Sequence, residues 1–340
     1  MELLTLSAIK RYDASRMHKV YDKWPNLARE SYESVDDELD FKNIDHIVFS
    51  GMGGSGTLGD IFSSILSKSN IHTTVVKGYT LPSTVDSNTL VITTSVSGNT
   101  EETLSSLNLA SKLDCKIVAF SNGGKMQKFC QKNKITYYGI CSVHSPRASL
   151  PLFLYSMLRY LGPMFKIKKG DIEESLKILS NLQEKIVSSN LSDDNPSLNL
   201  AMQLTGTPII YYPWGLHTSA IRFKNSLQEN AKLHAMAEDM MEATHNGILA
   251  WEKPSSLQPV LIQGQDDFIK TKERWMILKE FLKSKKINYL EVFSCHGSIL
   301  SKLIYLIYLL DYSTLYTSFL LKRDPTPVPS IEFVKRRITA

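Results

Sequence analysis

The chain has 340 residues, of which 43% are hydrophobic, and its 39 basic and 34 acidic side chains leave a formal net charge of +5. This length allows two domains or one large one, with enough apolar residues to fill a core. The charge excess is small and contains no long basic run, so we expect no nucleic-acid partner, whereas a small anionic ligand is allowed.

The first half of the chain predicts a parallel sheet covered by helices. Residues 1–35 have a polar helical pattern with a break at Trp24 and Pro25. After them, strands are expected at 46–50, 72–76, 89–94, 116–120 and 136–140, and continuous apolar runs such as 117–120 predict strands buried on both faces. Helical patterns separate these runs, at 55–67, 100–113 and 124–133. Repeated strand–helix units of this length are typical of a doubly wound α/β domain.

The second half predicts another sheet of the same type, as a diverged internal duplication. A helical stretch covers about 150–190, and the polar, turn-prone segment 192–196 is a candidate linker. The later elements are expected as strands at 208–212, 258–263 and 288–293, and as helices at 218–236, 268–284, 298–320 and about 330–338. The predicted domain organisation is a helical segment, two α/β domains and a C-terminal tail helix, at 1–35, 36–190, 191–323 and 324–340.

A glycine-rich turn at 51–56, Gly-Met-Gly-Gly-Ser-Gly, follows the first strand and leads into a helix. Backbone N–H groups in such a turn can approach an anion closely, and the helix N-terminus adds about half a positive charge. The turn also satisfies the dinucleotide pattern G-x-G-x-x-G. That pattern needs an acidic residue at the end of the second strand, where this chain has Lys77. A lysine is wrong for NAD, although it could meet a 2′-phosphate. A dinucleotide site and a turn needed only for tight strand-to-helix packing both remain as lesser alternatives.

A hydroxyl-rich turn follows the third strand and also leads into a helix. Ser95, Ser97 and Thr100 surround Gly98 there. A helix N-cap would need only one such hydroxyl, so the set exceeds what capping requires. Neutral donors bind phosphate without adding charge. Two such turns in consecutive strand–helix units therefore favour one small phosphorylated ligand held from two sides.

The two turns, in this order, resemble the SIS (sugar isomerase) family of phosphosugar-binding domains. The chain as a whole is similar to the bifunctional phosphoglucose/phosphomannose isomerases, a family with two SIS domains in tandem. Further matching segments are 145–147, 229–232, 242–246 and 324–328, followed by Lys335. The chain departs from the family by extra length around 165–200, and by Gly247, where an acidic residue usually follows His-Asn.

The resemblance implies reversible aldose–ketose isomerisation of glucose 6-phosphate and mannose 6-phosphate to fructose 6-phosphate through a cis-enediolate. It implies that the sugar phosphate is bound by residues of the two turns, which are Gly53, Gly54, Ser55, Ser95, Ser97 and Thr100. Glu229 is the expected base, and Arg147 would stabilise the enediolate. His245, with Lys335 on a tail helix packed at the active site, would open the sugar ring. Thr326 is a candidate contributor near C2.

The residues alone also allow a structural interpretation of each catalytic candidate. Arg147 could form a surface salt bridge, and Glu229 could pair with Lys232 on a solvated helix. His245 could be an ordinary hydrogen-bonded side chain, and Lys335 shares its helix face with two further basic residues. For each of these residues, the resemblance favours the catalytic interpretation over the structural one. It does not decide which terminal basic residue reaches the site.

The resemblance further implies a homodimer in which His245 enters the neighbouring subunit's site. No metal or other cofactor is expected, because the His and Cys residues lack ligand spacing. None of the four cysteines lies in a C-x-x-C pair, and the apolar stretch 304–310 is too short to span a bilayer, so a cytoplasmic protein without membrane attachment is expected. A non-catalytic SIS regulator and an isomerase of another phosphosugar remain as alternatives.

Overall fold

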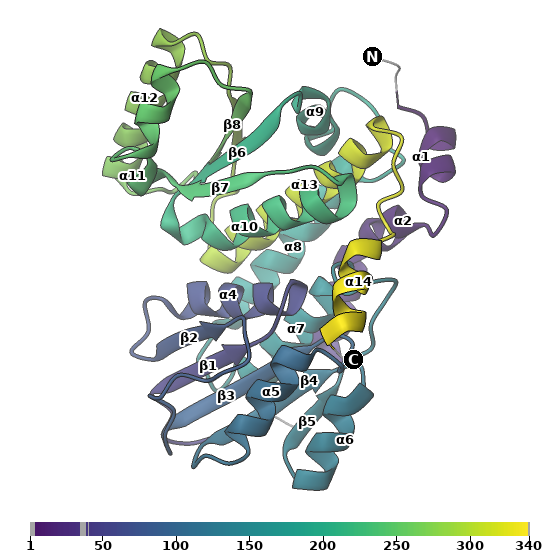
Figure 1. The fold of residues 1–340 in the computed structure, drawn as a ribbon, viewed down its shortest axis with the longest axis vertical. Coiled ribbons are helices and arrows are strands. Elements are labelled where there is room, and N and C mark those ends of the chain that lie inside the picture. The colour runs from purple at the N-terminus through teal and green to yellow at the C-terminus, as the bar shows by residue number, and fades with distance from the viewer. Residues whose placement is uncertain (1–3, 35–38, 40, 339–340) are drawn as a thin grey trace. The chain divides into compact units, whose positions relative to one another are not determined.

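The computed structural model describes residues 4–34, 39 and 41–338, and it contains two compact units (Figure 1). The five-stranded unit comprises Lys23–Ile172 and Val328–Ala340, and the four-stranded unit comprises Met1–Asp22 and Glu173–Pro327. Each unit is built from two separate pieces of the chain. The predicted domain boundaries therefore stay predictions, and the boundary between residues 35 and 36 lies outside the described residues.

The five-stranded unit contains an all-parallel sheet with the order β2-β1-β3-β4-β5. Its strands are β1 (His46–Ser50), β2 (His72–Val76), β3 (Thr89–Ser95), β4 (Lys116–Ser121) and β5 (Thr136–Gly139). Its helices are α3 (Trp24–Glu33), α4 (Gly54–Leu66), α5 (Glu101–Ala110), α6 (Gly124–Asn133), α7 (Leu150–Leu161) and α14 (Pro329–Ile338). Trp24 and Pro25 thus begin helix α3 at the predicted break. Proline is tolerated in the first helical turn because the N–H group that it lacks would have no acceptor within the helix.

Both faces of this sheet are covered. Val48, Val91 and Ala119 pack toward α5 and α6. On the opposite face, the Phe49 ring stacks on Phe62 of α4 at 5.4 Å. The predicted doubly wound fold is therefore confirmed. In the strand order β2-β1-β3, the chain reverses direction across the sheet between β1 and β3, and ligands of such folds bind at the carboxyl ends of those two strands.

The four-stranded unit also has an all-parallel sheet, with the order β7-β6-β8-β9. Its strands are β6 (Thr207–Tyr212), β7 (Met236–Asp239), β8 (Leu257–Gln263) and β9 (Leu290–Phe293). Its α-helices are α1 (Leu6–Tyr12), α2 (Met17–Asp22), α9 (Pro196–Gln203), α10 (His217–Ser226), α11 (Met240–Ala243), α12 (Ile269–Ser284) and α13 (Ile299–Leu320), and α8 (Lys169–Ile186) enters it from the other unit. The short helical turns are η1 (Trp214–Leu216), η2 (Leu227–Ala231) and η3 (Gly247–Glu252).

Helix α13 forms much of the core of this unit. Among the described residues, α13 is the single helix with the length and the apolar composition that crossing a membrane requires. Of its most apolar 18-residue segment, 89% is buried inside the protein. The expectation that this stretch is too short was wrong, because the helix continues well beyond 304–310. Its burial against α9 and α10 accounts for its apolar composition, as in the core helix of a soluble protein.

The predicted helix at 218–236 is wrong in its second half. Helix α10 ends at Ser226, η2 widens into a π-helical turn, and Lys232 leaves it in the left-handed conformation with φ +56°. The chain then forms strand β7, which pairs with β6. The sequence retains good helix formers through this region, so local preference favours a helix and the tertiary pairing overrides it.

Candidate active site

The two predicted phosphate-binding turns are joined directly in the five-stranded unit. The Val96 N–H of the second turn donates to Ser55 Oγ of the first, over 3.3 Å. The turns follow β1 and β3, which are neighbours in the sheet, so both lie at the place where this fold binds ligands. Ser55 is buried, whereas Gly53 and Ser97 are exposed. The paired turns are therefore held together by a buried contact and present an exposed edge to solvent.

The second turn has little room to vary. Ser95 Oγ lies 2.9 Å from Thr100 Oγ1, and Ser97 Oγ accepts from the Asn99 N–H over 3.3 Å. Gly98 has φ +67°, and a Cβ there would lie 1.8 Å from the Gly123 carbonyl oxygen. Only glycine fits this position. The close approach of two backbone segments thus holds the hydroxyls in place.

Arg147 lies beside the first turn. A Cβ on Gly54 would lie 3.5 Å from the Pro146 carbonyl oxygen and 3.8 Å from Arg147 Cα. The Arg147 side chain is only 6% exposed, unlike the surface residue of the structural interpretation. Ser149 Oγ, which donates to the Val143 and Ser145 carbonyls at 2.9 Å, shapes the loop that carries it. The structure therefore brings the predicted enediolate-stabilising arginine to the predicted phosphate-binding turns.

Additional hydroxyl groups lie beneath these turns, and the sequence analysis missed them. Ser50 and Thr93 are register partners at the carboxyl ends of β1 and β3. Within the described part of the chain, the side-chain oxygens of both residues and of Ser145 are buried without a hydrogen-bond partner. Such groups are rare in folded proteins, which usually satisfy them. These hydroxyl groups next to the turns could therefore still form hydrogen bonds.

The dinucleotide interpretation of the first turn finds no support. Lys77 at the end of β2 forms an ion pair with Asp60 of α4, at 2.6 Å. Its aliphatic stem also lies against the first turn, since a Cβ on Gly56 would be 3.1 Å from Lys77 Cε. The position that would need a ribose-binding carboxylate is thus filled by a cation with a structural partner.

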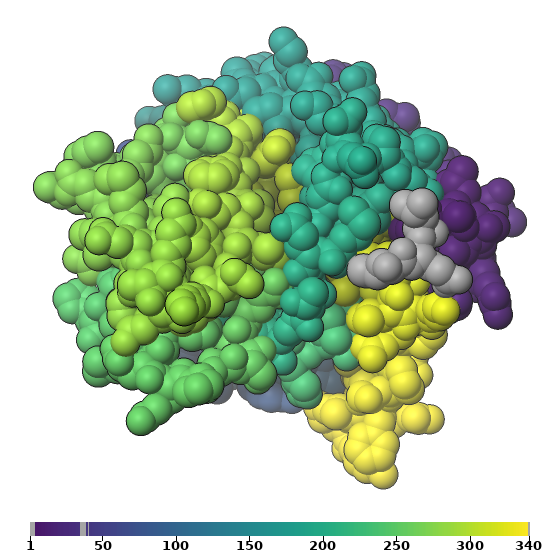
Figure 2. All heavy atoms as spheres, turned by 90° about the horizontal axis from the view of Figure 1, so that it is seen from above, coloured from purple at the N-terminus to yellow at the C-terminus, as the bar shows by residue number. Residues whose placement is uncertain are grey.

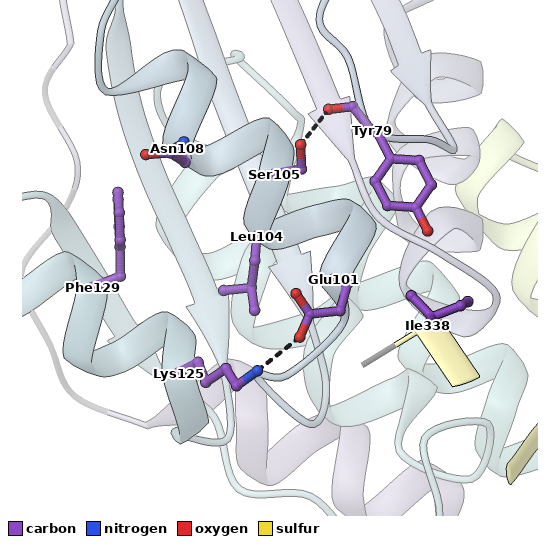
Figure 3. Close-up of a pocket in the computed structure, with 8 residues that line it drawn as sticks. All are labelled: Tyr79, Glu101, Leu104, Ser105, Asn108, Lys125, Phe129 and Ile338. Carbon is purple, nitrogen blue, oxygen red and sulfur yellow. Dashed lines mark hydrogen bonds and ion pairs between the residues drawn. The ribbon is translucent and has the colours of Figure 1, made fainter. Parts of the chain in front are cut away.

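A hollow of about 490 Å³ lies on the outer side of α5 in the same unit (Figure 3). The Glu101–Lys125 ion pair of 2.7 Å crosses one side of it, and Ser105 Oγ donates to the Tyr79 carbonyl on another. None of the six predicted phosphate-binding residues lines it. The hollow is therefore separate from the predicted phosphate-binding residues.

Glu229 lies in the four-stranded unit, within the π-helical turn η2, and is half-buried. π-Helical turns are rare and occur frequently at functional sites. Lys232 Nζ donates to the Glu229 main-chain carbonyl at 2.5 Å and to the Pro325 carbonyl at 3.0 Å. The negative charge of Glu229 also affects the pKa of Arg222. Burial lowers the pKa of Arg222, but its buried partner Asp311, and more weakly Glu229, raise it overall.

His245 is exposed on the loop that follows α11 in the four-stranded unit. Arg274 of α12 lies beside it, with Nη1 2.8 Å from Thr244 Oγ1 and 3.5 Å from His245 Nε2. A guanidinium can only donate, so Nε2 takes the acceptor role in this contact. Sequence reasoning missed Arg274, because nothing near residue 274 signals a partner for a histidine in another element.

Lys335 and Thr326 have different surroundings. Lys335 lies on α14, whose residues are all exposed, in the same unit as the turns. Thr326 lies in the four-stranded unit, where its Oγ1 is 2.6 Å from Ser15 Oγ. Glu229 and His245 share that unit with Thr326. Contacts within a unit thus join Arg147 to the turns, but they do not join Glu229 or His245 to them.

The four-stranded unit carries carboxylates where the five-stranded unit carries hydroxyls. The turn after β8 contains Asp266 and Asp267. Asp266 binds His296 Nδ1 at 2.6 Å and Lys302 Nζ at 2.9 Å, and Asp267 accepts from the Gly264 N–H. Fixed carboxylates repel a phosphate. The turn after β8 is therefore a poorer candidate for phosphate than the two turns of the five-stranded unit.

The described residues contain no group of three or more His, Cys, Asp or Glu side chains that could hold a metal ion.

Comparisons with known proteins identify both halves of the chain. Residues 40–153 match the family model of the SIS domain, and residues 193–338 match that of the bacterial phospho-glucose isomerase C-terminal SIS domain. A bifunctional phosphoglucose/phosphomannose isomerase from Caldicellulosiruptor bescii is 33% identical over 92% of this chain and 96% of its own length. A protein of the same name from Aquifex aeolicus is 31% identical over 86% and 90%.

A solved structure supports the fold. A hypothetical protein from Thermus thermophilus superimposes with a TM-score of 0.75, covering 98% of this chain and 93% of its own, at 15% identity. At this identity the likeness concerns the fold alone. The predicted pair of SIS-type α/β folds is thus confirmed.

Proposed function

The chain belongs to the bifunctional phosphoglucose/phosphomannose isomerases, and from this membership we propose how its residues carry out the reaction. The protein is an isomerase that interconverts glucose 6-phosphate, mannose 6-phosphate and fructose 6-phosphate. The observation that carries the residue assignments is the junction of the two turns through Ser55 and Val96, with Arg147 beside them.

The two turns would bind the phosphate of the sugar. Their exposed edge offers backbone N–H groups and neutral hydroxyl donors, which suit a phosphate monoester. The residues in this role are Gly53, Gly54, Ser55, Ser95, Ser97 and Thr100. The phosphate does not react, so binding it positions C1 and C2 for the chemistry.

His245, with Lys335 nearby, would open the pyranose ring by moving a proton between the C1 hydroxyl and the ring oxygen. One proton leaves the C1 hydroxyl and another reaches the ring oxygen, which gives the open-chain aldose.

Glu229 would then remove the proton from C2 and return it to C1, while the hydroxyl proton passes from O2 to O1. The cis-enediolate between these steps carries negative charge, which the Arg147 guanidinium would stabilise. General acid–base transfer contributes ~10²–10⁴-fold and a charge-stabilising donor about 10²–10³-fold. Glucose 6-phosphate and mannose 6-phosphate differ only at C2, so both give this enediolate if the open chain can rotate about C2–C3.

A homodimer would bring His245 into the partner's site. The support is an exposed apolar face on α12, next to Arg274. The segment that contains α12 is coloured green to yellow-green in Figure 2. Ile269, Met276 and Ile277 share that face by helical spacing, and each is between 58% and 62% exposed. Large apolar groups clustered in this way are typical of a surface that another protein covers. We infer that the occupant is a second copy of this chain.

The compartment would be the cytoplasm. All four cysteines are free, and the long apolar helix α13 is buried in the protein's own core. Both observations suit a soluble protein in a reducing environment.

A coupled assay with fructose 6-phosphate, measured with and without a chelator, tests the function. We expect glucose 6-phosphate and mannose 6-phosphate to form at rates that the chelator leaves unchanged. Binding without turnover would instead support a phosphosugar-binding regulator. Turnover only of another phosphosugar would indicate a different isomerase.

A further inference from the structure

The turn that carries Glu229 has an unusual backbone. The Leu227 carbonyl accepts from the Lys232 N–H, which closes a π-helical ring, and also from the Leu233 N–H at 3.2 Å. Lys232 closes the turn with φ +56°, a conformation that normally favours glycine. A strained turn of this kind persists only where its surroundings hold it.

A buried hydrogen bond holds the inner side of the turn. Asn230, the residue after Glu229, donates from Nδ2 to Thr314 Oγ1 of α13 over 2.8 Å, and both side chains are fully buried. Thr314 Oγ1 in turn donates to the Asp311 carbonyl at 2.7 Å. The hydroxyl thus has a defined polarity, accepting from the amide and donating to the helix backbone.

Two cations hold the outer side of the turn. Arg323 Nη1 donates to the Ala231 carbonyl at 2.6 Å and to the Lys232 carbonyl at 3.3 Å. These are carbonyls that a helix end leaves without internal partners, and a cation there also complements the helix dipole. Lys232 adds its bonds to the Glu229 and Pro325 carbonyls. Backbone atoms at residues 229, 231 and 232 are therefore all fixed.

We propose that Thr314, acting through Asn230, and Arg323 are positioning residues that hold this π-helical turn and so fix the Glu229 carboxylate against C2. The proposal rests on the proposed role of Glu229 as the base. A base must lie within hydrogen-bond reach of the proton that it abstracts, and a displacement of about 1 Å can cost about 10²-fold in rate. Neither residue supplies a reacting group, so both act on proton transfer and not on phosphate binding.

The test compares Thr314→Val, Thr314→Ser and Arg323→Ala with two matched controls. Thr317→Val removes a buried α13 hydroxyl that donates only to the Ser313 carbonyl, and Arg29→Ala removes a surface arginine paired with Glu33. For each variant we would measure Tm, and kcat and KM with glucose 6-phosphate. We would also measure the isotope effect on kcat with deuterium at C2.

We expect Thr314→Val and Arg323→Ala to lower kcat about 10-fold or more, with KM within about 2-fold and an isotope effect at least as large as in the wild type. Thr314→Ser keeps the hydroxyl and should restore kcat, and both controls should match the wild type. Unchanged kcat, a rise in KM alone, or an isotope effect falling toward unity would overturn the proposal. If Thr314→Val does not fold, the exposed Arg323→Ala variant decides.

Glu229→Gln in the same assay separates this proposal from the function on which it rests. Retained turnover in Glu229→Gln would remove the base assignment whatever the other variants do. Loss of turnover in Glu229→Gln together with normal kcat in Thr314→Val and Arg323→Ala would contradict the positioning proposal alone.

Discussion

The Val96 N–H donates to Ser55 Oγ over 3.3 Å, so a residue at the start of α4 is tied to the backbone that follows β3. This bond joins two turns that are separated in sequence by helix α4 and strands β2 and β3. Ser55 Oγ is the acceptor in this bond and is buried, whereas Ser97 of the second turn is exposed to solvent. The relationship leads to predictions about ligand binding that differ from those about chemistry.

Removing hydroxyls from the second turn should weaken substrate binding more than it slows turnover. We expect Ser95→Ala combined with Ser97→Ala to raise KM for fructose 6-phosphate about 10-fold or more, because hydrogen bonds to a charged phosphate are stronger than neutral ones. The kcat should change little. Ser105→Ala is the control, since that hydroxyl binds the Tyr79 carbonyl beside the separate hollow. Steady-state kinetics would check this, and an unchanged KM in the double variant would rule out phosphate binding by this turn.

Gly98 should tolerate no side chain. A Cβ there would collide with the Gly123 carbonyl oxygen, and the φ of +67° is unfavourable for other residues. We therefore expect Gly98→Ala to lower both Tm and kcat/KM. Gly215→Ala, where a Cβ would meet open space, should change neither. Thermal unfolding and the isomerase assay would measure both effects, and wild-type behaviour of Gly98→Ala would contradict the described turn.

The fold could be predicted from the sequence where apolar runs were continuous. Strands β1, β3 and β4 are buried on both faces and have no polar alternation to obscure them. Strand β7 was missed because Met236–Asp239 lacks β-branched residues and is held as a strand by pairing with β6. The end of the helical segment after α10 and η2 was missed because Lys232, and not glycine, takes the left-handed position that closes η2.

The candidate site could be predicted only in part, for a similar reason. The phosphate-binding turns carry a local signal in their glycines and hydroxyls. Arg147, Glu229 and His245 carry none, and were proposed from the family resemblance alone. The neighbours Arg274, Thr314 and Arg323 act through tertiary contacts with residues far away in sequence, and no pattern along the chain indicates such contacts.

A mixture of two inactive variants should recover activity if His245 acts across a dimer. Glu229→Gln and His245→Ala each damage a different half of a shared site. A mixed dimer then has one site with both defects and one with neither, so about a quarter of wild-type activity should return on co-expression. Each variant alone should stay inactive. The isomerase assay on the co-expressed mixture would measure this, and no recovery would place His245 in the site of its own subunit.

Glu174 should make the stability of the four-stranded unit depend on pH. It accepts from Ser301 Oγ at 2.6 Å and the Ser298 N–H at 2.9 Å at the start of α13, and these bonds lower its pKa below the ordinary 4.5. A depressed folded pKa adds stability above the unfolded value, and this stability is lost as pH falls through the folded value. Glu174→Gln should therefore lower Tm at pH 7, with the difference from wild type shrinking below about pH 4.

The control for this effect is Glu273→Gln, which alters a surface pair with Lys270. Its Tm should follow the wild type across the whole pH range, because exposed pairs contribute little. A Glu174→Gln difference that is constant with pH, or that grows in acid, would show that the Glu174 charge does not stabilise the start of α13.

The assignment of Glu229 as the base that moves the proton between C2 and C1 is the central claim. The most direct measurement is turnover and fructose 6-phosphate binding by Glu229→Gln, compared with the wild type. We predict a Kd within a few-fold of wild type and a kcat reduced by ~10²–10⁴-fold, because the amide keeps the shape of the side chain and cannot accept the proton. A Glu229→Gln enzyme that keeps kcat within about tenfold of wild type would contradict the account.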